Sequence, residues 1–325
     1  MRSIGLLLFL LLTVVLPAPS QTQDPHFESL TREFEYDVKA PLEVREVSRE
    51  RRGGVTVVDL TYASARGGSV PAYLVVPAGR WPFAAILFGH WMMQGSPLKN
   101  RREFLEEALV LARSGAISLL IDAPYERPGF LKEKDEMREV AQGSEVSRQQ
   151  VIDFRRGIDL LTARSDVDPK RIAYVGHSFD AHVGGILSGV EKRIGSFVLM
   201  AGSFANEEYV FDPENAEMKK LRERLGDDQI RDYFRKYAWD DPIHFVGHSG
   251  PASVFLQFGR HDKPITDKMA RRYYELFAEP KQIGFYDAGH ALDAEARRDR
   301  VEWLAKRLSL KRVDKAALGR IPQLK

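Results

Sequence analysis

The sequence predicts an α/β protein whose central sheet is mostly parallel and is flanked by helices on both sides. Short apolar runs alternate with longer segments in which apolar residues recur at helical spacing. Some runs, such as residues 83–88 and 116–121, are apolar almost throughout, as expected of strands covered on both faces. After an opening hairpin, strand and helix alternate to the end of the chain, which is typical of a parallel sheet with crossover helices.

The composition is that of a folded globular protein and excludes several classes of function. Of the 325 residues, 44% are hydrophobic and 29% are charged, and the formal net charge is +2 at pH 7. No basic block is interleaved with aromatic residues, so we expect no nucleic-acid partner. The chain has no cysteine, which excludes a cysteine nucleophile, a thiolate zinc site and disulfides.

The N-terminus has the layout of a secretory signal peptide, which we assign to residues 1–20. Arg2 gives a positive start, residues 4–16 are apolar, and Pro17 to Ser20 introduce small residues before a cleavage site. The apolar run has about thirteen residues, whereas a helix needs roughly twenty to cross a bilayer. We therefore expect a secreted or periplasmic protein with no stable membrane insertion after cleavage.

Each further element is predicted from its local pattern. Residues 21–50 are polar with little periodicity and predict an irregular arm, and the turn at 65–68 joins two antiparallel strands. Apolar runs predict strands over 55–62, 70–76, 83–88, 116–121, 171–175, 196–200, 253–258 and 282–286. Helical spacing predicts helices over 98–114, 146–163, 179–190 and 291–308.

One segment interrupts the alternation. Residues 204–248 are highly charged, contain helical pieces at 214–225 and 229–237, and lie between two predicted core strands. Such an excursion from the sheet predicts a small helical cap insertion over the strand ends. We expect residues 21–325 to form one domain that carries this cap, because a chain of this length suits a single large α/β domain.

The strongest signal for chemistry is Gly176-His177-Ser178. An apolar strand leads into this turn, and a helix follows at Phe179. A serine hydroxyl is a poor nucleophile and must be held exposed beside a base. A sharp strand-to-helix turn does this and directs backbone N–H groups toward developing negative charge. The turn predicts Ser178 as nucleophile and the Phe179 N–H as one oxyanion-hole donor.

An acid and a base are expected at the ends of later strands, in the order serine, acid, histidine. A strand that ends in Gly-Arg-His-Asp delivers Asp262, and the next strand runs into Asp-Ala-Gly-His, which delivers His290 to the same edge of the sheet. We predict that Asp262 orients His290 and that His290 takes the proton of Ser178. Asp287 is the alternative acid, although its closeness to His290 in sequence makes the geometry awkward.

The segment 70–308 resembles the α/β-hydrolase superfamily, and within it the serine esterases and peptidases related to dienelactone hydrolase and prolyl oligopeptidase. The resemblance rests on Asp168-Pro-Lys-Arg-Ile-Ala-Tyr-Val-Gly-His-Ser178, Gly259-Arg-His-Asp262 and Gly289-His290. It implies the α/β-hydrolase fold and, without cysteine, the branch that uses serine. The sequence departs from the family pattern Gly-x-Ser-x-Gly at Asp180, where the last glycine usually permits close packing of the helix on a strand.

The same resemblance places the second oxyanion-hole donor in the loop after the strand at 83–88. It points to the Trp91 N–H, with Met92 as the alternate. Met92 and Tyr125, which follows another core strand, are the predicted substrate contacts. Plain hydrophobic packing is the alternative for all three residues.

Two further features resemble functional sites but are not assigned a function. Gly247-His248-Ser249 repeats the Gly-His-Ser string, but it precedes a strand, which would place its serine at the wrong end of the sheet. His244 and His248 have metal-like spacing, but Pro242 and Gly247 disfavour the regular helix that such a pair requires. We expect no metal ion and no organic cofactor, since phosphate-binding and dinucleotide fingerprints are also missing.

The sequence therefore predicts a secreted serine hydrolase that cleaves a small-molecule ester through a Ser178–His290–Asp262 triad and an acyl-enzyme. One alternative is a serine peptidase of the prolyl-oligopeptidase type that acts on short peptides. The other is a catalytically silent binding protein with the same fold, which only Asp180 favours.

Overall fold

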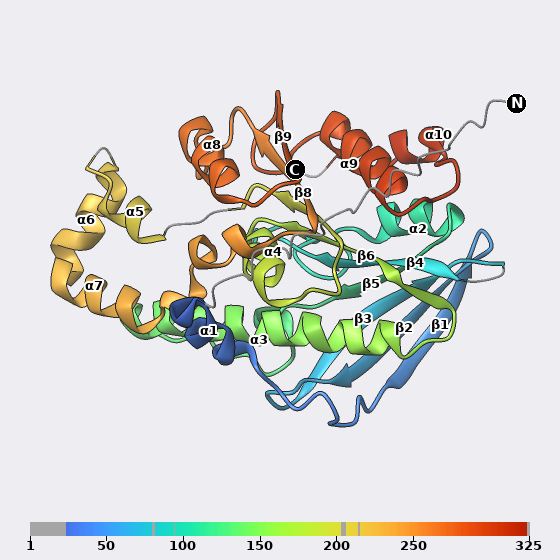
Figure 1. The fold of residues 1–325 in the computed structure, drawn as a ribbon, viewed down its shortest axis with the longest axis horizontal. Helices are drawn as coiled ribbons and strands as arrows, with labels where there is room; N and C mark the ends of the chain where they lie inside the picture. Colours follow the sequence, from blue (N-terminus) through green and yellow to red (C-terminus); the bar gives the residue numbers. More distant parts are fainter. Residues whose placement is uncertain (1–23, 80–81, 94, 203–205, 214, 324–325) are drawn as a thin grey trace, which may run out of the picture.

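The computed structural model describes residues 24–323 except 80–81, 94, 203–205 and 214. The predicted signal peptide lies outside this part of the chain. The strands are β1 (Arg45–Arg52), β2 (Val55–Ala63), β3 (Ser69–Val76), β4 (Phe83–Gly89), β5 (Ala116–Ile121), β6 (Val167–His177), β7 (Ser196–Met200), β8 (Ser253–Gly259) and β9 (Lys281–Tyr286). They form one sheet in the order β1-β2-β3-β5-β4-β6-β7-β8-β9, with helices on both faces (Figure 1).

The sheet has an antiparallel side and a larger parallel side. β1, β2, β3 and β5 pair antiparallel, whereas β5, β4, β6, β7, β8 and β9 pair parallel in that spatial order. The carboxyl ends of β6, β8 and β9 therefore lie at one edge of the sheet. These are the strands after which the predicted nucleophile, acid and base follow, so the topology brings those residues together.

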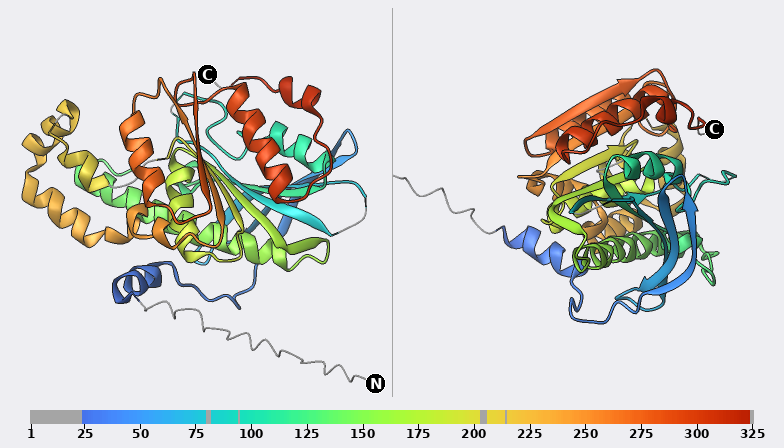
Figure 2. Two further views of the ribbon diagram at one scale, coloured as in Figure 1. Left: turned by 45° about the horizontal axis from the view of Figure 1, so that its top comes forward. Right: turned by 90° about the vertical axis from the view of Figure 1, so that its right-hand side faces the viewer.

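Two hydrophobic cores lie on the two faces of the sheet. One is covered by α3 (Glu136–Thr162), α4 (Phe179–Val190) and α8 (Asp267–Leu276). The other is covered by α2 (Leu105–Arg113), α9 (Ala294–Arg307) and α10 (Lys315–Gly319). Every residue of β4 is buried, and alternate side chains enter alternate cores, because side chains of a strand point to opposite faces. Figure 2 shows the twisted sheet between these helical layers.

The N-terminal arm is more regular than its sequence suggests. Residues 21–50 were expected to be irregular, but they include α1 (Pro25–Thr31), the 3-10 turn η1 (Arg32–Phe34) and most of the edge strand β1. The prediction was wrong at β1 because this strand is exposed along nearly its whole length. An edge strand without a buried face shows no apolar alternation, and here pairing with β2 fixes it.

The helices differ from prediction mainly at their ends. α3 begins at Glu136, well before the predicted start at 146, because the Asp135 side chain caps it by accepting the Arg138 N–H. α2 begins at Leu105 instead of residue 98, and α8 and α10 were not predicted. Within the part of the chain described here, no helix has the length and apolar character that a membrane crossing requires.

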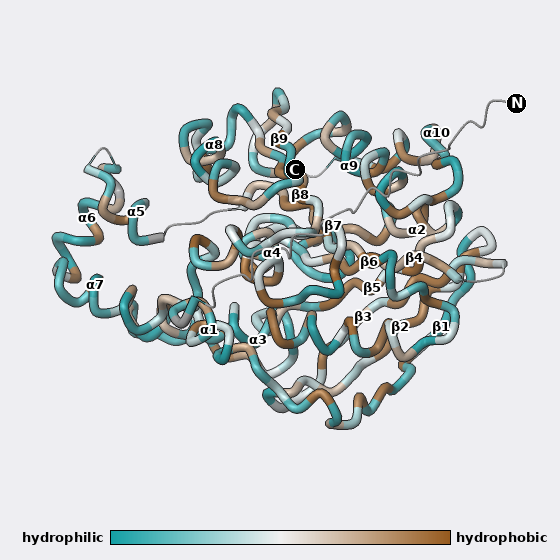
Figure 3. Tube along the Cα trace, in the orientation of Figure 1, coloured by the Kyte–Doolittle hydropathy of each residue, from teal (hydrophilic) through white to brown (hydrophobic). Residues whose placement is uncertain are grey.

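The predicted cap insertion lies between β7 and β8. It contains α5 (Asn206–Phe211), α6 (Ala216–Leu225), α7 (Asp227–Lys236), η3 (Ala238–Asp240), η4 (Pro242–His244) and η5 (Val246–His248). α6 and α7 are largely hydrophilic and project from one end of the molecule (Figure 3). Both helices contact the N-terminal part of α3: Tyr233 Oη of α7 lies 2.5 Å from Ser144 Oγ, and Arg224 of α6 pairs with Glu136.

Candidate active site

Ser178 occupies the sharp turn between β6 and α4. Its backbone has φ 54° and ψ −109°, a conformation that residues other than glycine rarely adopt and that costs on the order of 1–3 kcal/mol. The turn also requires glycine two positions earlier, since a Cβ on Gly176 would lie 2.2 Å from the Asp180 carbonyl oxygen. The Ser178 N–H donates to the Met200 carbonyl (2.8 Å), which ties the turn to β7.

The structure brings the three predicted side chains into one hydrogen-bonded chain. Ser178 Oγ lies 2.7 Å from His290 Nε2, and His290 Nδ1 lies 2.9 Å from Asp262 Oδ2. An ionised carboxylate can only accept, so Nδ1 carries the proton and Nε2 is left to take one from the serine. The Asp262 side chain is 0% exposed and that of His290 16%, so Asp262 is shielded while His290 reaches solvent.

Close approach of two loops places the acid and the base. Gly259 ends β8, and a Cβ there would lie 2.4 Å from the carbonyl oxygens of Ala288 and Gly289. Glycine at this position therefore allows the loop that carries His290 to reach Asp262. Asp287, the alternative acid, bonds instead to His261 (2.6 Å), and its side chain is 90% exposed.

Ser178 and His290 open into a cavity of about 770 Å³. Its wall combines apolar side chains with polar ones, and it takes residues both from the core and from the insertion. The apolar members include Met92, Met93, Phe179 and Ile265. The polar members include Ser144, Ser147, His182, Tyr233 and Asp240.

Comparison with known proteins shows similarity in structure alone. No family model matches the sequence, and no curated protein does. Acetyl xylan esterase 1 from Thermoanaerobacterium sp. JW/SL YS485 is similar with a TM-score of 0.70 and 17% identity, over 87% of this chain and 94% of that chain. The acetyl xylan esterase from Paenibacillus sp. R4 is similar with a TM-score of 0.66 and 17% identity, over 86% of this chain and 92% of that chain. The α/β hydrolase GrgF from Penicillium sp. sh18 is similar with a TM-score of 0.56 and 15% identity, over 81% of this chain and 100% of that chain.

The chain has the α/β-hydrolase fold. The fold prediction is thereby confirmed, with the strand order and crossover helices described above and a helical insertion after β7.

Asp180 fits the α/β-hydrolase turn because the missing glycine is replaced by one on the neighbouring strand. A Cβ on Gly89, at the end of β4, would lie 2.5 Å from Asp180 Cβ. The buried Asp180 carboxyl accepts from Gln150 Nε2 (3.0 and 3.2 Å) and from the His90 backbone N–H. Burial raises the pKa of Asp180 well above its usual value, and these hydrogen bonds only partly oppose that rise.

The loop after β4 carries Trp91 and Met92, the two residues predicted to offer the second oxyanion-hole donor. The Trp91 N–H donates to Glu103 Oε2 (2.7 Å). In this arrangement the N–H already has an acceptor, so its use as an oxyanion-hole donor requires that this hydrogen bond be broken. The alternate residue, Met92, is 56% exposed and lies on the cavity wall. Phe179 is the first residue of α4, where N–H groups have no acceptor within the helix.

Glu103 and His177 form a second acid–histidine pair, which the sequence analysis missed. Glu103 Oε1 lies 2.5 Å from His177 Nδ1, and both side chains are 0% exposed. His177 Nε2 donates to the His290 carbonyl (2.9 Å), and the Trp91 ring stacks on the His177 ring at 4.9 Å. The pair therefore joins the loop after β4 to the loop that carries the base.

Tyr125, a predicted substrate contact, packs against Phe179 and the loop after β4. Its ring meets that of Phe179 edge-on at 5.3 Å, and its hydroxyl lies 3.4 Å from the Trp91 carbonyl. Tyr125 is not among the described residues that line the cavity. The side chain is turned toward the loop after β4.

The two features that resemble functional sites in the sequence lie apart from the Ser178 cavity. Ser249 is buried and precedes β8, whereas the acid follows this strand. The His248 ring stacks on Phe27 at 3.7 Å, and the His244 ring meets His26 edge-on. Among the described residues, no three His, Cys, Asp or Glu side chains are grouped as metal ligands would be.

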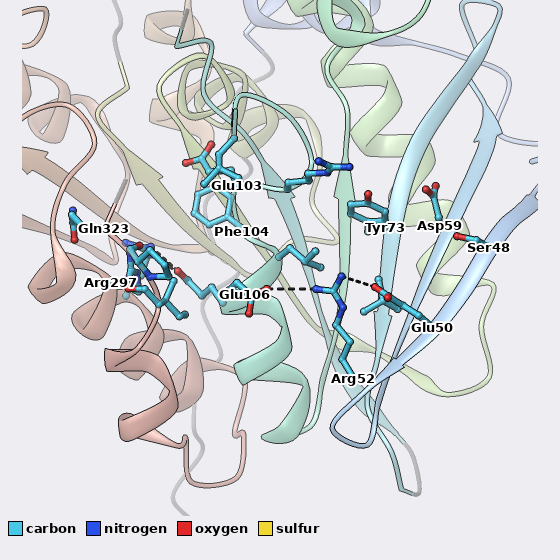
Figure 4. A pocket seen from close by; sticks show the side chains of 18 of the residues that line it. Ser48, Glu50, Arg52, Asp59, Tyr73, Glu103, Phe104, Glu106, Arg297 and Gln323 are labelled. Atoms are coloured by element: carbon cyan, nitrogen blue, oxygen red, sulfur yellow. Dashed lines mark hydrogen bonds and ion pairs between the residues drawn. The ribbon is translucent and has the colours of Figure 1, made fainter. Parts of the chain in front are cut away.

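A second cavity, of about 680 Å³, lies where β1 to β3, α2 and the C-terminal segment meet (Figure 4). Acids and arginines on its wall pair with one another, as Arg52 does with Glu50 (2.7 Å) and with Glu106 (3.5 Å). Neither Ser178 nor His290 lines it. The cavity at Ser178 is therefore the candidate active site.

Proposed function

We propose that this protein is a serine hydrolase that cleaves carboxylic esters, with Ser178 as nucleophile, His290 as general base and acid, and Asp262 as the residue that orients the base. The observation that carries the proposal is the chain of hydrogen bonds from Ser178 Oγ through His290 to Asp262, set at a strained turn that faces a cavity. The acetyl xylan esterases among the similar structures support an ester as substrate.

The reaction follows from the proton positions. As Ser178 Oγ attacks the ester carbonyl, His290 Nε2 takes its proton, and Asp262 stabilises the imidazolium. The Phe179 N–H, at the positive end of α4, stabilises the oxyanion of the tetrahedral intermediate. Collapse breaks the bond to the alcohol oxygen, which receives the proton from His290. Water, deprotonated by His290, then attacks the acyl-enzyme and releases the acid and Ser178.

We also propose export of the protein, on the strength of the signal-peptide pattern in residues 1–20. The reaction as written needs no cofactor. A substrate panel separates esters from short peptides, since both classes are cleaved by the same triad. We expect hydrolysis of 4-nitrophenyl acetate and butyrate and none of dipeptide 4-nitroanilides.

The test is mass spectrometry of the mature protein after treatment with a fluorophosphonate. We expect a single adduct on Ser178, which Ser178→Ala abolishes. Ser249→Ala is the matched control, because Gly247-His248-Ser249 repeats the same string at a site without a triad, and it should label like wild type. An unlabelled Ser178 in folded protein contradicts the proposal and favours a silent binding protein.

A further inference from the structure

The cavity at Ser178 has a polar wall that the proposed reaction does not use. Ser144 and Ser147 reach it from α3, His182 from α4, and Tyr233 and Asp240 from the insertion between β7 and β8. None of these residues holds a member of the Ser178–His290–Asp262 chain. Together the three hydroxyl groups and the acid–histidine pair that line this cavity can both donate and accept hydrogen bonds.

The Ser147 hydroxyl is unusual on this wall. Ser147 is only 2% exposed, and its Oγ has no hydrogen-bond partner among the described residues. Buried polar groups in native proteins nearly always have partners, since an unmade hydrogen bond is unfavourable. Because the residue also lines the cavity, a ligand group is the partner that this site can acquire.

His182 and Asp240 present a charged pair to the same space. His182 lies four residues after Ser178, one helical turn along α4, so both are on the same face of the helix. His182 Nε2 and Asp240 Oδ1 are 3.3 Å apart, and the two side chains are 11% and 13% exposed. Burial acts to lower the pKa of His182, but the hydrogen bond to Asp240 and its charge outweigh this and raise it. Asp240 therefore favours the protonated form of His182.

The Ser144 and Tyr233 hydroxyls bond to each other at 2.5 Å, and each keeps further lone pairs for a ligand. Lys263 and His261 also line this cavity, but within this wall the one acid, Asp240, is paired with His182, and the remaining groups are hydroxyls. Its complement is an uncharged group that can also donate and accept. Hydroxyl groups have this chemistry.

We propose that this wall, defined by Ser144, Ser147, His182, Tyr233 and Asp240, is a subsite for an uncharged, hydroxyl-bearing arm of the ester. The proposal rests on the proposed function, since it concerns the substrate of the same cavity. The arm is either the acyl group or the alcohol, and matched pairs of esters distinguish the two.

For the acyl arm, the probes are 4-nitrophenyl butyrate and 4-nitrophenyl 3-hydroxybutyrate. For the alcohol arm, they are propyl acetate and glycerol 1-monoacetate, followed by acetate release. We expect wild-type kcat/KM to be about tenfold higher for the hydroxylated member of one pair, as one well-made hydrogen bond provides. Ser147→Ala and, independently, Tyr233→Phe should each reduce this preference severalfold.

Ser118→Ala is the matched control. Ser118 is a fully buried serine on β5 whose hydroxyl also lacks a partner among the described residues, but it does not line the cavity. This variant should keep the wild-type preference. Equal rates for both members of each pair in wild type, or a preference that survives Ser147→Ala and Tyr233→Phe, overturn the subsite while leaving the esterase intact. If wild type hydrolyses none of the four esters, the proposed function itself is overturned.

Discussion

Asp180→Asn tests whether the carboxyl that replaces the usual glycine is held uncharged in the folded protein. The side chain is 0% exposed and accepts hydrogen bonds from Gln150 and from the His90 backbone, both of which an asparagine oxygen can also accept. The substitution therefore keeps the shape of the side chain and one of the two oxygens that accept from Gln150, and it removes the ability to ionise. Its effect should appear in how stability depends on pH.

The sign follows from the raised pKa of Asp180. In the unfolded chain this carboxyl loses its proton near pH 4, whereas the folded protein retains it to higher pH. Between these two pKa values the folded state binds more protons, so the free energy of unfolding falls as pH rises, by about 1.4 kcal/mol per pH unit. Asparagine has no such dependence.

His90 acts in the opposite direction over part of the same range. Burial lowers its pKa from 6.5 to about 4, so the stability that it contributes rises with pH between these values, by about 3 kcal/mol in total. Where both groups titrate, the contributions of Asp180 and His90 oppose each other in the wild type. Asp180→Asn should expose the rise from His90 alone.

The assay is urea unfolding of both proteins at pH 4.5, 5, 5.5 and 6. We expect the free energy of unfolding of Asp180→Asn to rise by about 1.4 kcal/mol per pH unit relative to wild type. Asp228→Asn, at an exposed position on α7, should run parallel to wild type. A parallel course for Asp180→Asn as well would show that Asp180 ionises alike in both states, and the burial argument would be refuted.

Two further predictions concern the same region. Gly89→Ala should destabilise the protein, because its Cβ meets Asp180 Cβ at 2.5 Å, and Asp180→Gly should relieve that cost by about 1–3 kcal/mol in a double-mutant cycle. The Cβ of Gly176→Ala meets the Asp180 backbone, so Asp180→Gly should not relieve the destabilisation that this variant causes. If Asp180→Gly relieves both alanine variants equally, the proposed contact between Gly89 and the Asp180 side chain is contradicted. In Glu103→Gln the amide can still accept from Trp91 and donate to His177, so the free energy of unfolding in urea should fall by only about 1 kcal/mol. Glu103→Ala leaves a buried N–H unpaired, and the free energy of unfolding should fall by about 3 kcal/mol. The alanine variant should also lower kcat with little change in KM, as the His290 loop loses its anchor, and equal effects of the two variants would argue against this role.

The parts of the fold that were predicted well are those with two buried faces. β7 and α4 have the predicted bounds, since a continuous apolar run and a regular apolar stripe depend only on burial. β1 was missed because its side chains are exposed and its conformation comes from pairing with β2. The polar start of α3 was missed for a related reason, as a capping residue and contacts with the insertion hold it.

The candidate site divides in the same way. Ser178, Asp262 and His290 were found because topology alone brings the carboxyl ends of β6, β8 and β9 together. Glu103 was not found, since it lies in a loop before α2 and its contacts with Trp91 and His177 depend on how that loop packs. Strand order is visible in the spacing of motifs, whereas the direction of one backbone N–H is not.

Asp180 was the only residue that favoured a silent binding protein, and its surroundings remove that support. Glycine is common at this position because the helix after the nucleophile packs closely on a neighbouring strand. Here the space is provided by Gly89 on β4, and the carboxyl fills it with hydrogen bonds from Gln150 and from the loop after β4. What the turn requires is room between α4 and β4, from whichever side the glycine comes. The departure from the family pattern is therefore a rearrangement of packing behind Ser178, and it leaves Ser178, His290 and Asp262 in hydrogen-bonding positions.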